Sequence, residues 1–335
     1  MDLKPTPPKD AANRYLTQKQ THVTRKTYHN YSTTLYQLTD WLTENGYDDL
    51  RDVDSDVIDQ YKQYRLEHVK PITAKNDMQT IKNFIEFCES IHAVPVNLAQ
   101  LIQIPKVPAG DDICDTILTR EEAVAILDYL SKYEYASNRH VTVLILWKTG
   151  MRTGGLRALD LNDFDEGRPA LTIRHRPQTR TALKQRENSE RDVLITPETA
   201  STISDYIQTN RNDVTDDNHR KPLITTAQGR VSSTSVQKYV YTSTRPCEYN
   251  GGNCPYDRNV ETCEATRYDN GNACPGSVSP HALRRGYVTA ARNAGQPKDV
   301  TSERVDMSGP ILEKHYDHGT YDEKAERRRE HVKDI

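Results

Sequence analysis

A stretch without helical periodicity, Ile104 to Cys114, most constrains how this 335-residue chain can fold, because it separates two long segments that each carry their own pattern. The stretch contains Pro105, Pro108 and Gly110, followed by two aspartates. This composition is typical of a connecting segment and not of a helix or strand. We therefore expect two domains, which the length of the chain allows, joined by a linker at residues 105–116.

The first segment has the spacing of amphipathic helices. Apolar side chains recur at steps of three and four at Tyr28, Tyr31, Leu35, Leu38 and Leu42. Asn45-Gly46 ends this pattern, and similar stripes follow at residues 57–64 and 78–91. The sequence predicts an all-helical domain at residues 16–104. Three prolines among the first ten residues favour a flexible arm at residues 1–15.

The second segment mixes helices with a few strands. Thr119 and Glu122 have the spacing of a capping box, and Gly150 ends an apolar helix over residues 140–148. Residues 170–174 and 191–195 have the pattern of two strands that flank a long, basic loop. The expected fold class is therefore mainly α with a small β-hairpin or sheet, the second domain being α+β over residues 117–335.

Net charge and hydropathy exclude some classes and leave others open. The net charge of −3 does not indicate a nucleic-acid binder, but basic residues cluster within residues 1–30 and 174–191. These clusters are either solvated faces or a DNA grip, and the candidate contacts are Lys26, Arg174, Arg176, Arg180, Arg186 and Arg285. The longest largely apolar run has seven residues, Val141 to Trp147 with Thr142 inside it, and no signal core opens the chain. We expect a cytoplasmic protein without membrane segments.

The stretch Ser279 to Gly286 has the features of a helix start with an anion site. Ser279 is a suitable N-cap and Pro280 suits the first helical position. His281 and Arg284 then lie three residues apart on one face of the first turn, where unpaired backbone N–H groups favour an anion. A solvated basic turn has the same pattern, so other residues must decide.

Three separated features join this pair. Arg152 follows a helix end at Thr149-Gly150, Lys184 lies in the basic loop, and Tyr316 lies near the end of the chain. Arg, Lys, His-x-x-Arg and Tyr in this order resemble the tyrosine recombinase family (phage integrase, Xer-like) over about residues 20–325. The resemblance implies a helical DNA core-binding domain of SAM-like type followed by a tyrosine-recombinase catalytic domain.

The resemblance also implies a reaction. Arg152 and Arg284 would clamp a DNA phosphodiester, Tyr316 would form a 3′-phosphotyrosyl link, and Lys184 and His281 would move protons. Tyr321 is the competing nucleophile, and Arg180 and Arg186 compete with Lys184. The chemistry would need no metal and no ATP. The implied partners are a double-stranded recombination site, three further copies of the chain in a tetramer on paired sites, and accessory DNA-bending proteins.

The chain departs from the family pattern in two places near this site. The family usually has a Gly-His pair, or a Trp, nine or ten residues before the nucleophile, where this chain has Arg304-Val305-Asp306-Met307. Arg304 could contact the phosphate instead. The family also often carries an acidic residue three positions after the first arginine, where this chain has Gly155. The support of that arginine must therefore be built differently.

A cysteine-rich insert at residues 245–276 precedes Ser279. Its four cysteines are Cys247, Cys254, Cys263 and Cys274. Four thiolates could hold a structural zinc ion, although their spacing is wider than in the common motifs. Disulfides and unliganded thiols are the alternatives. The insert resembles cysteine-bearing inserts in archaeal members of the family.

Two other functions fit the same residues. One is a non-catalytic DNA-binding protein that kept the recombinase fold and lost activity at the missing histidine. The other is DNA relaxation of the type IB topoisomerase kind, which uses the same chemistry. The ordered set of five residues favours recombination over both.

Overall fold

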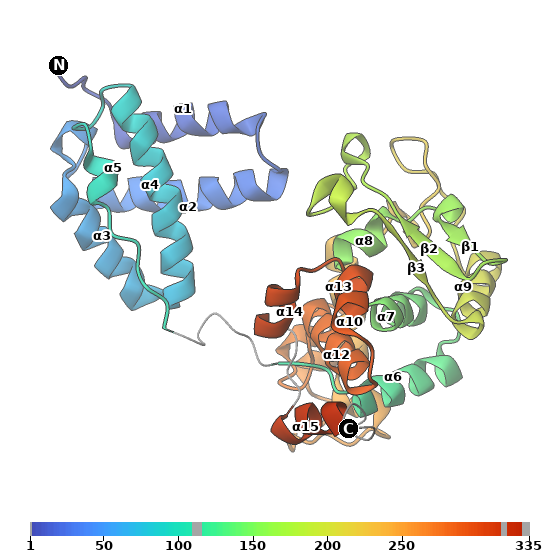
Figure 1. The fold of residues 1–335 in the computed structure, drawn as a ribbon. Coiled ribbons are helices and arrows are strands. Elements are labelled where there is room, and N and C mark those ends of the chain that lie inside the picture. Colours follow the sequence, from blue (N-terminus) through green and yellow to red (C-terminus); the bar gives the residue numbers. More distant parts are fainter. Residues whose placement is uncertain (1, 109–115, 316–319, 330–335) are drawn as a thin grey trace. The chain divides into compact units, whose positions relative to one another are not determined.

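The chain divides into two compact units, Met1–Ile113 and Cys114–Ile335. The structure is a computed structural model that describes residues 2–108, 116–315 and 320–329. Both units are dominated by helices, and the strands form two small sheets in the second unit (Figure 1). The predicted fold class, mainly α with a small sheet, is confirmed.

The first unit is helical throughout its described part. Its helices are α1 (Pro8–Gln20), α2 (Arg25–Glu44), α3 (Ser55–His68), α4 (Pro71–Ser90) and α5 (Leu98–Leu101), with a 3₁₀ turn η1 at Leu50–Asp52. Thr24 caps α2 by accepting a hydrogen bond from the amide of Thr27, and Asn45 ends it. Leu35 and Leu38 of α2 are buried in one core with Phe84 of α4. The amphipathic spacing read from the sequence thus faces this core.

The start of the chain differs from the prediction. Residues 1–15 were expected to form a flexible arm, but α1 begins at Pro8 and its side chains Ala11 and Leu16 are buried in the core of the first unit. Pro8 occupies the first helical position, where a missing N–H costs nothing. The three prolines therefore mark a helix start, and the predicted arm is wrong for residues 8–15.

The second unit surrounds one buried helix. Its helices are α6 (Arg120–Tyr133), α7 (Asn138–Thr149), α8 (Thr153–Ala158), α9 (Pro197–Thr209), α10 (Ser233–Ser243), α11 (Pro246–Tyr249), α12 (Pro280–Asn293), α13 (Lys298–Val305), α14 (Gly309–His315) and α15 (Tyr321–Arg329). Helix α7 packs against α6, α9, α10 and α12 (Figure 1). Every side chain from His140 to Trp147 is buried, as expected for a helix that is apolar on all faces. Within the described residues, no helix has the length and apolar character needed to cross a membrane.

The strands form one three-stranded and one two-stranded antiparallel sheet. The first has the order β1 (Phe164–Asp165), β2 (Ala170–Ile173), β3 (Arg191–Leu194), and the second pairs β4 (Thr225–Thr226) with β5 (Gly229–Arg230). Ala170 pairs with Leu194 and Ile173 with Arg191, so β2 and β3 form the predicted hairpin. The basic segment between them is its loop.

Helix α12 approaches its neighbours more closely than a side chain would permit. A Cβ atom on Gly286 would lie 1.9 Å from the carbonyl oxygen of Leu118, and Leu118 donates its own N–H to the carbonyl of Ala282 at 3.3 Å. Gly150, at the end of α7, has φ +61°, and a Cβ there would lie 2.3 Å from the ring of Tyr287. The two glycines therefore fix how α12 lies against α7 and against the chain entering α6.

We expect Gly286→Ala to destabilise the second unit by about 2 kcal/mol, because the added methyl group meets backbone that cannot move aside cheaply. Gly154→Ala is the matched control. It lies in α8 with nothing within 4 Å of its Cβ position, so alanine should be neutral or stabilise by up to about 1 kcal/mol. Urea unfolding followed by Trp147 fluorescence, in a Trp41→Phe background, measures both. Equal midpoints for the two variants would contradict the packing argument.

Candidate active site

The first turn of α12 carries His281 and Arg284. Ser279 occupies the N-cap position with extended backbone but makes no side-chain capping bond, and Pro280 takes the first helical position. Arg284 is 1% exposed, and its Nη1 donates to the carbonyl oxygen of Gly150 at 2.7 Å. This bond joins the start of α12 to the end of α7, because the carbonyl groups at a helix end lack partners within the helix.

Arg152 lies two residues beyond Gly150, at the N-cap position of α8. Its extended backbone (φ −70°, ψ 152°) turns the chain between the two helices. The side chain is 23% exposed, and its Nη1 donates to Oδ2 of Asp306. The Thr-Gly-x-Arg sequence thus places one guanidinium beside the start of α12.

The loop between β2 and β3, residues 174–190, contains two 3₁₀ turns, Pro177–Thr179 and Arg186–Ser189. Lys184 lies between these turns and is exposed. The amide of Leu183 donates to Nδ1 of His175 at 2.9 Å, which crosses the loop just before Lys184. Local hydrogen bonds therefore order this basic loop in spite of its polarity.

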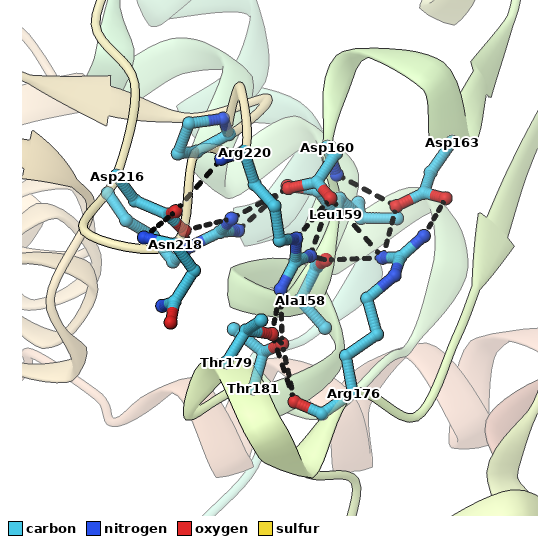
Figure 2. Close-up of polar contacts among 12 residues, drawn as sticks. Ala158, Leu159, Asp160, Asp163, Arg176, Thr179, Thr181, Asp216, Asn218 and Arg220 are labelled. Atoms are coloured by element: carbon cyan, nitrogen blue, oxygen red, sulfur yellow. Dashed lines mark hydrogen bonds and ion pairs between the residues drawn. The ribbon is translucent and has the colours of Figure 1, made fainter.

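A network of three arginines and three aspartates holds the base of the loop (Figure 2). Arg176 donates both terminal nitrogens to Asp163, at 2.7 and 2.6 Å. Arg220 binds Asp160 at 2.6 Å and also donates to the hydroxyl of Thr181 in the loop at 2.8 Å. The loop is thereby tied to the segment that follows α8.

The third pairing closes this network. Arg230 bridges Asp160 and Asp216, with both distances 2.7 Å. Burial alone would raise the pKa of Asp216, but the hydrogen bonds from Arg230 and from backbone amides outweigh it and hold that pKa below its usual value. Paired, hydrogen-bonded charges of this kind hold segments in place, because a charge left without its partner would be costly.

His281 lies among positive charges. The residue is partly exposed to solvent, but much of its ring is surrounded by protein. This burial is the largest cause of a His281 pKa lowered to about 4. Arg284, Arg285, Arg152 and Lys184 lower it further. The imidazole is therefore neutral at pH 7. The three basic residues predicted to act together with His281 therefore lie within electrostatic reach of its ring: Arg152, Lys184 and Arg284.

Asp306 is a site residue that the sequence reasoning did not single out. It ends α13 in the left-handed conformation (φ 57°) and accepts hydrogen bonds from Arg152 and from the hydroxyl of Ser189 at 2.7 Å. Arg191 lies close to it, and burial lowers the pKa of Arg191 to about 10 while Asp306 partly opposes that shift. The missing histidine had drawn attention to residues 304–307, but no sequence signal pointed to this partnership.

Arg304 and Met307 lie in the region where tyrosine recombinases usually have a donor side chain. Arg304 donates to the hydroxyl of Tyr287 at 2.6 Å and to the carbonyl of Lys148 at 3.0 Å. Met307 is buried in a small apolar cluster with Val288, Val305 and Leu312. The predicted phosphate contact of Arg304 stays a prediction, and these two bonds already engage its guanidinium.

The candidate DNA contacts fall into three groups. Arg174, Arg180 and Arg186 are exposed in the hairpin loop, and Lys26 is exposed on α2 of the first unit. Arg285 donates to the carbonyl of Thr116 at 3.0 Å. Arg176 differs, because its bonds to Asp163 make it part of the network that supports the loop. We therefore assign Arg176 to the structure of the loop and leave the others as predicted contacts.

The four cysteines of residues 245–276 all belong to the described part of the chain and are free. No group of three or more Cys, His, Asp or Glu side chains in that part gathers as a metal site, so the predicted zinc site is not assembled here. The insert is held instead by bonds such as that from Arg245 to the carbonyl of Ala265, at 2.7 Å. Burial raises the pKa of Cys247, and Cys274 and Cys254, which lie within electrostatic reach of it, raise that pKa further.

The predicted nucleophile, Tyr316, lies outside the described residues. Helix α14 ends at His315, one residue before it, and α15 begins with the competing Tyr321, which is 86% exposed.

Comparison with known proteins shows the fold. No family model matches the sequence, and no curated protein matches it. Among solved structures, the chain is similar to the Tn1549 transposon integrase in complex with transposon right end DNA, with 16% identity, 96% of this chain and 98% of that chain covered, and a TM-score of 0.65. It is also similar to a lambda integrase tetramer bound to a Holliday junction, with 12% identity, coverage of 95% and 79%, and a TM-score of 0.66.

These similarities extend over both units. The chain therefore has the fold of the tyrosine recombinases and integrases. At such low identity the likeness concerns the fold alone, so the roles of the individual residues rest on their chemistry.

We expect an NMR titration to find the ring of His281 neutral at pH 7 and half-protonated only near pH 4. Arg285→Gln should raise this pKa, yet leave it below the usual value of about 6.5, because burial is the larger cause. The unfolded chain takes up this proton first, so the shift also lowers folding stability as the pH falls from about 6.5 to about 4. A His281→Gln variant assigns the signal. A midpoint near 6.5 in the unaltered protein would contradict this electrostatic account.

Proposed function

We propose that this protein is a site-specific DNA recombinase of the integrase or excisionase type, which cuts and rejoins DNA through a 3′-phosphotyrosyl intermediate. The observation that carries the proposal is the convergence of Arg152, Lys184 and Arg284 around the neutral His281 on a recombinase fold. Arg152 and Lys184 come from other segments than α12, which carries both His281 and Arg284, and the positive charges of all three basic residues act on the His281 ring.

Two guanidinium groups suit a DNA phosphate. Phosphoryl transfer from a diester passes through five-coordinate phosphorus, and fixed, permanently charged donors stabilise the added negative charge. Arg152 and Arg284 are the proposed clamp. Arg284 is almost fully buried, so a phosphate reaches it only if its surroundings rearrange when DNA binds.

Tyr316 is the proposed nucleophile. Its phenolic oxygen bonds to the phosphorus, the bond from phosphorus to the 5′ oxygen breaks, and that oxygen leaves as a hydroxyl group after taking up a proton. The phenol loses its own proton in the same step. When a 5′ hydroxyl from a partner strand attacks the phosphotyrosyl bond, the reaction runs in reverse and frees the tyrosine.

Lys184 and His281 are suited to the two proton transfers. Lys184 is a charged, exposed donor on a loop, and it can protonate the leaving 5′ oxygen. His281 is neutral at pH 7 and can accept the phenolic proton or orient the hydroxyl. The phosphotyrosyl bond retains the energy of the broken strand, so this scheme uses neither ATP nor a metal ion.

The proposed partners follow from the reaction. They are a double-stranded recombination site, further copies of this chain in a tetramer on paired sites, and accessory DNA-bending proteins. The lambda integrase structure is that of a tetramer on a Holliday junction, which supports the tetramer by analogy only. The exposed Arg174, Arg180 and Arg186 are proposed DNA contacts. The proposed place of action is the cytoplasm.

A second candidate is a non-catalytic DNA-binding protein with the same fold. Met307 is buried among apolar side chains, so it gives no donor at the position of the missing histidine, and Arg152 is already paired with Asp306. Both observations fit a site that binds DNA without cutting it. Formation of a covalent adduct distinguishes the two candidates.

Tyr316→Phe should abolish covalent protein–DNA adducts on a nicked suicide substrate and leave non-covalent DNA binding unchanged, because only the nucleophilic oxygen is lost. Tyr321→Phe is the matched control and should form adducts at the normal rate. Denaturing gels detect the adduct, and mobility shifts measure binding. An adduct that persists in Tyr316→Phe would refute this nucleophile, and a wild type that binds its site without forming one would favour the second candidate.

Zinc binding by the four cysteines is a separate proposal with weaker support. Only the nearness of Cys247 to Cys254 and Cys274 speaks for it, and the ion would brace the insert before α12 without taking part in the chemistry. Elemental analysis of protein purified without chelators should find about one zinc per chain, reduced in a Cys247→Ser variant. A folded protein without metal would refute it.

A further inference from the structure

We propose that Asp306 is the positioning residue of Arg152: its carboxylate holds one edge of that guanidinium so that the other edge faces the DNA phosphate. The inference rests on the proposed function and deepens it. Gly155, in α8, has no side chain and cannot support Arg152 as an acidic residue at that position would. Asp306 takes over this support.

The backbone fixes the carboxylate before any substrate arrives. Asp306 takes a left-handed conformation directly after α13, with φ 57° and ψ 69°, and only 9% of its side chain is exposed. Its amide donates to the carbonyl of Glu303 at 3.1 Å, which holds the turn. Aspartate and asparagine tolerate this conformation better than most residues do. The carboxylate is therefore an ordered feature of the site.

Oδ2 of Asp306 joins two elements that carry proposed catalytic residues. It accepts from Nη1 of Arg152 at the start of α8 and from the hydroxyl of Ser189 at the end of the hairpin loop. The same hydroxyl accepts from the amide of Gln185, the residue after Lys184, at 3.3 Å. One oxygen atom thus connects the first arginine of the clamp with the segment that bears the lysine.

The guanidinium of Arg152 keeps donors for a ligand. Among the residues that the structure describes, Asp306 is the hydrogen-bond partner of Nη1, and the side chain of Arg152 remains 23% exposed. A guanidinium has five N–H donors in a planar fork, so one edge can be held by a carboxylate while the other binds a phosphate. This geometry favours positioning over blocking.

The surrounding charges show why a carboxylate is needed. Arg152 and Arg304 both act on Arg191 as neighbouring positive charges, and Nε of Arg191 donates to the carbonyl of Arg304 at 2.9 Å. The lowered pKa of Arg191, about 10, still leaves it charged at neutral pH. Without Asp306, Arg152 and Arg191 would be neighbouring cations that have lost their shared counter-charge, and their repulsion would push Arg152 from its place.

Asp306→Asn tests the inference with little risk to folding, because asparagine suits the left-handed turn and keeps the shape of the side chain. Asp257→Asn is the matched control. Asp257 also has a left-handed backbone (φ 54°), loses the same charge and is exposed in the cysteine insert. Both variants are made in the full-length chain and compared on a nicked suicide substrate under single-turnover conditions.

Asp306→Asn should slow adduct formation at saturating DNA by about 100-fold, the effect of a misplaced catalytic group, while DNA affinity stays the same or tightens because a negative charge is gone. Asp257→Asn should cleave at the normal rate. In an Arg152→Lys background, Asp306→Asn should slow adduct formation far less than in the wild type, since the carboxylate acts through Arg152. A merely structural role would lower the melting temperature and affinity together with the rate.

Three results would overturn the inference. Cleavage by Asp306→Asn at the wild-type rate would show that the carboxylate does not position Arg152. Faster cleavage would show that it blocks the site. If Asp306→Asn slowed cleavage by the same factor in the Arg152→Lys background as in the wild type, the carboxylate would act elsewhere than through Arg152. A wild type that binds its DNA site but never forms an adduct is a distinct outcome, since it refutes the proposed function and the inference falls with it.

Discussion

The second unit depends on the close contact between α12 and the end of α7. The absent side chain of Gly286 lets α12 meet the backbone of Leu118, and the bond from Arg284 to the carbonyl of Gly150 joins the two helix ends. Arg152 follows that same helix end after two residues. The spacing of Arg152 and Arg284, the two arginines of the proposed clamp, is therefore set by backbone packing, which side-chain motion cannot easily disturb.

Charge distribution separates two tasks within the unit. Around the proposed active site, burial and then four neighbouring cations lower the pKa of His281 and keep its ring neutral at pH 7. Beneath the hairpin loop, three arginines face three aspartates and the charges cancel (Figure 2). The first arrangement suits an anionic ligand, while the second joins segments of the protein to one another.

Much of this could be read from the sequence. Apolar spacing, the capping box at Thr119 and Glu122, and Gly150 after a buried helix reflect local rules, and the structure follows them. The order of Arg152, Lys184, His281 and Arg284 resembles that of the tyrosine recombinases, and it is this resemblance that predicted a common site.

Other features depend on contacts distant in sequence. Asp306 is one aspartate among many until the fold places it against Arg152, 154 positions away in the chain. Arg176 belonged to a basic cluster in the sequence, and only the structure shows that Asp163 engages it. Pro8 misled because proline both interrupts and begins helices, and tertiary burial decides which.

The neutral network under the hairpin loop has a consequence for how the protein responds to ionic strength. Dissolved salt screens exposed charges and competes for the DNA backbone, so the proposed contacts of the loop arginines with DNA would weaken steeply as salt rises. The arginine–aspartate pairs beneath are partly or fully buried, at distances of 2.6 and 2.7 Å, and feel little of that screening. A change in the salt around the protein would thus act as a release signal for the nucleic acid, and the loop would keep its shape for the next encounter.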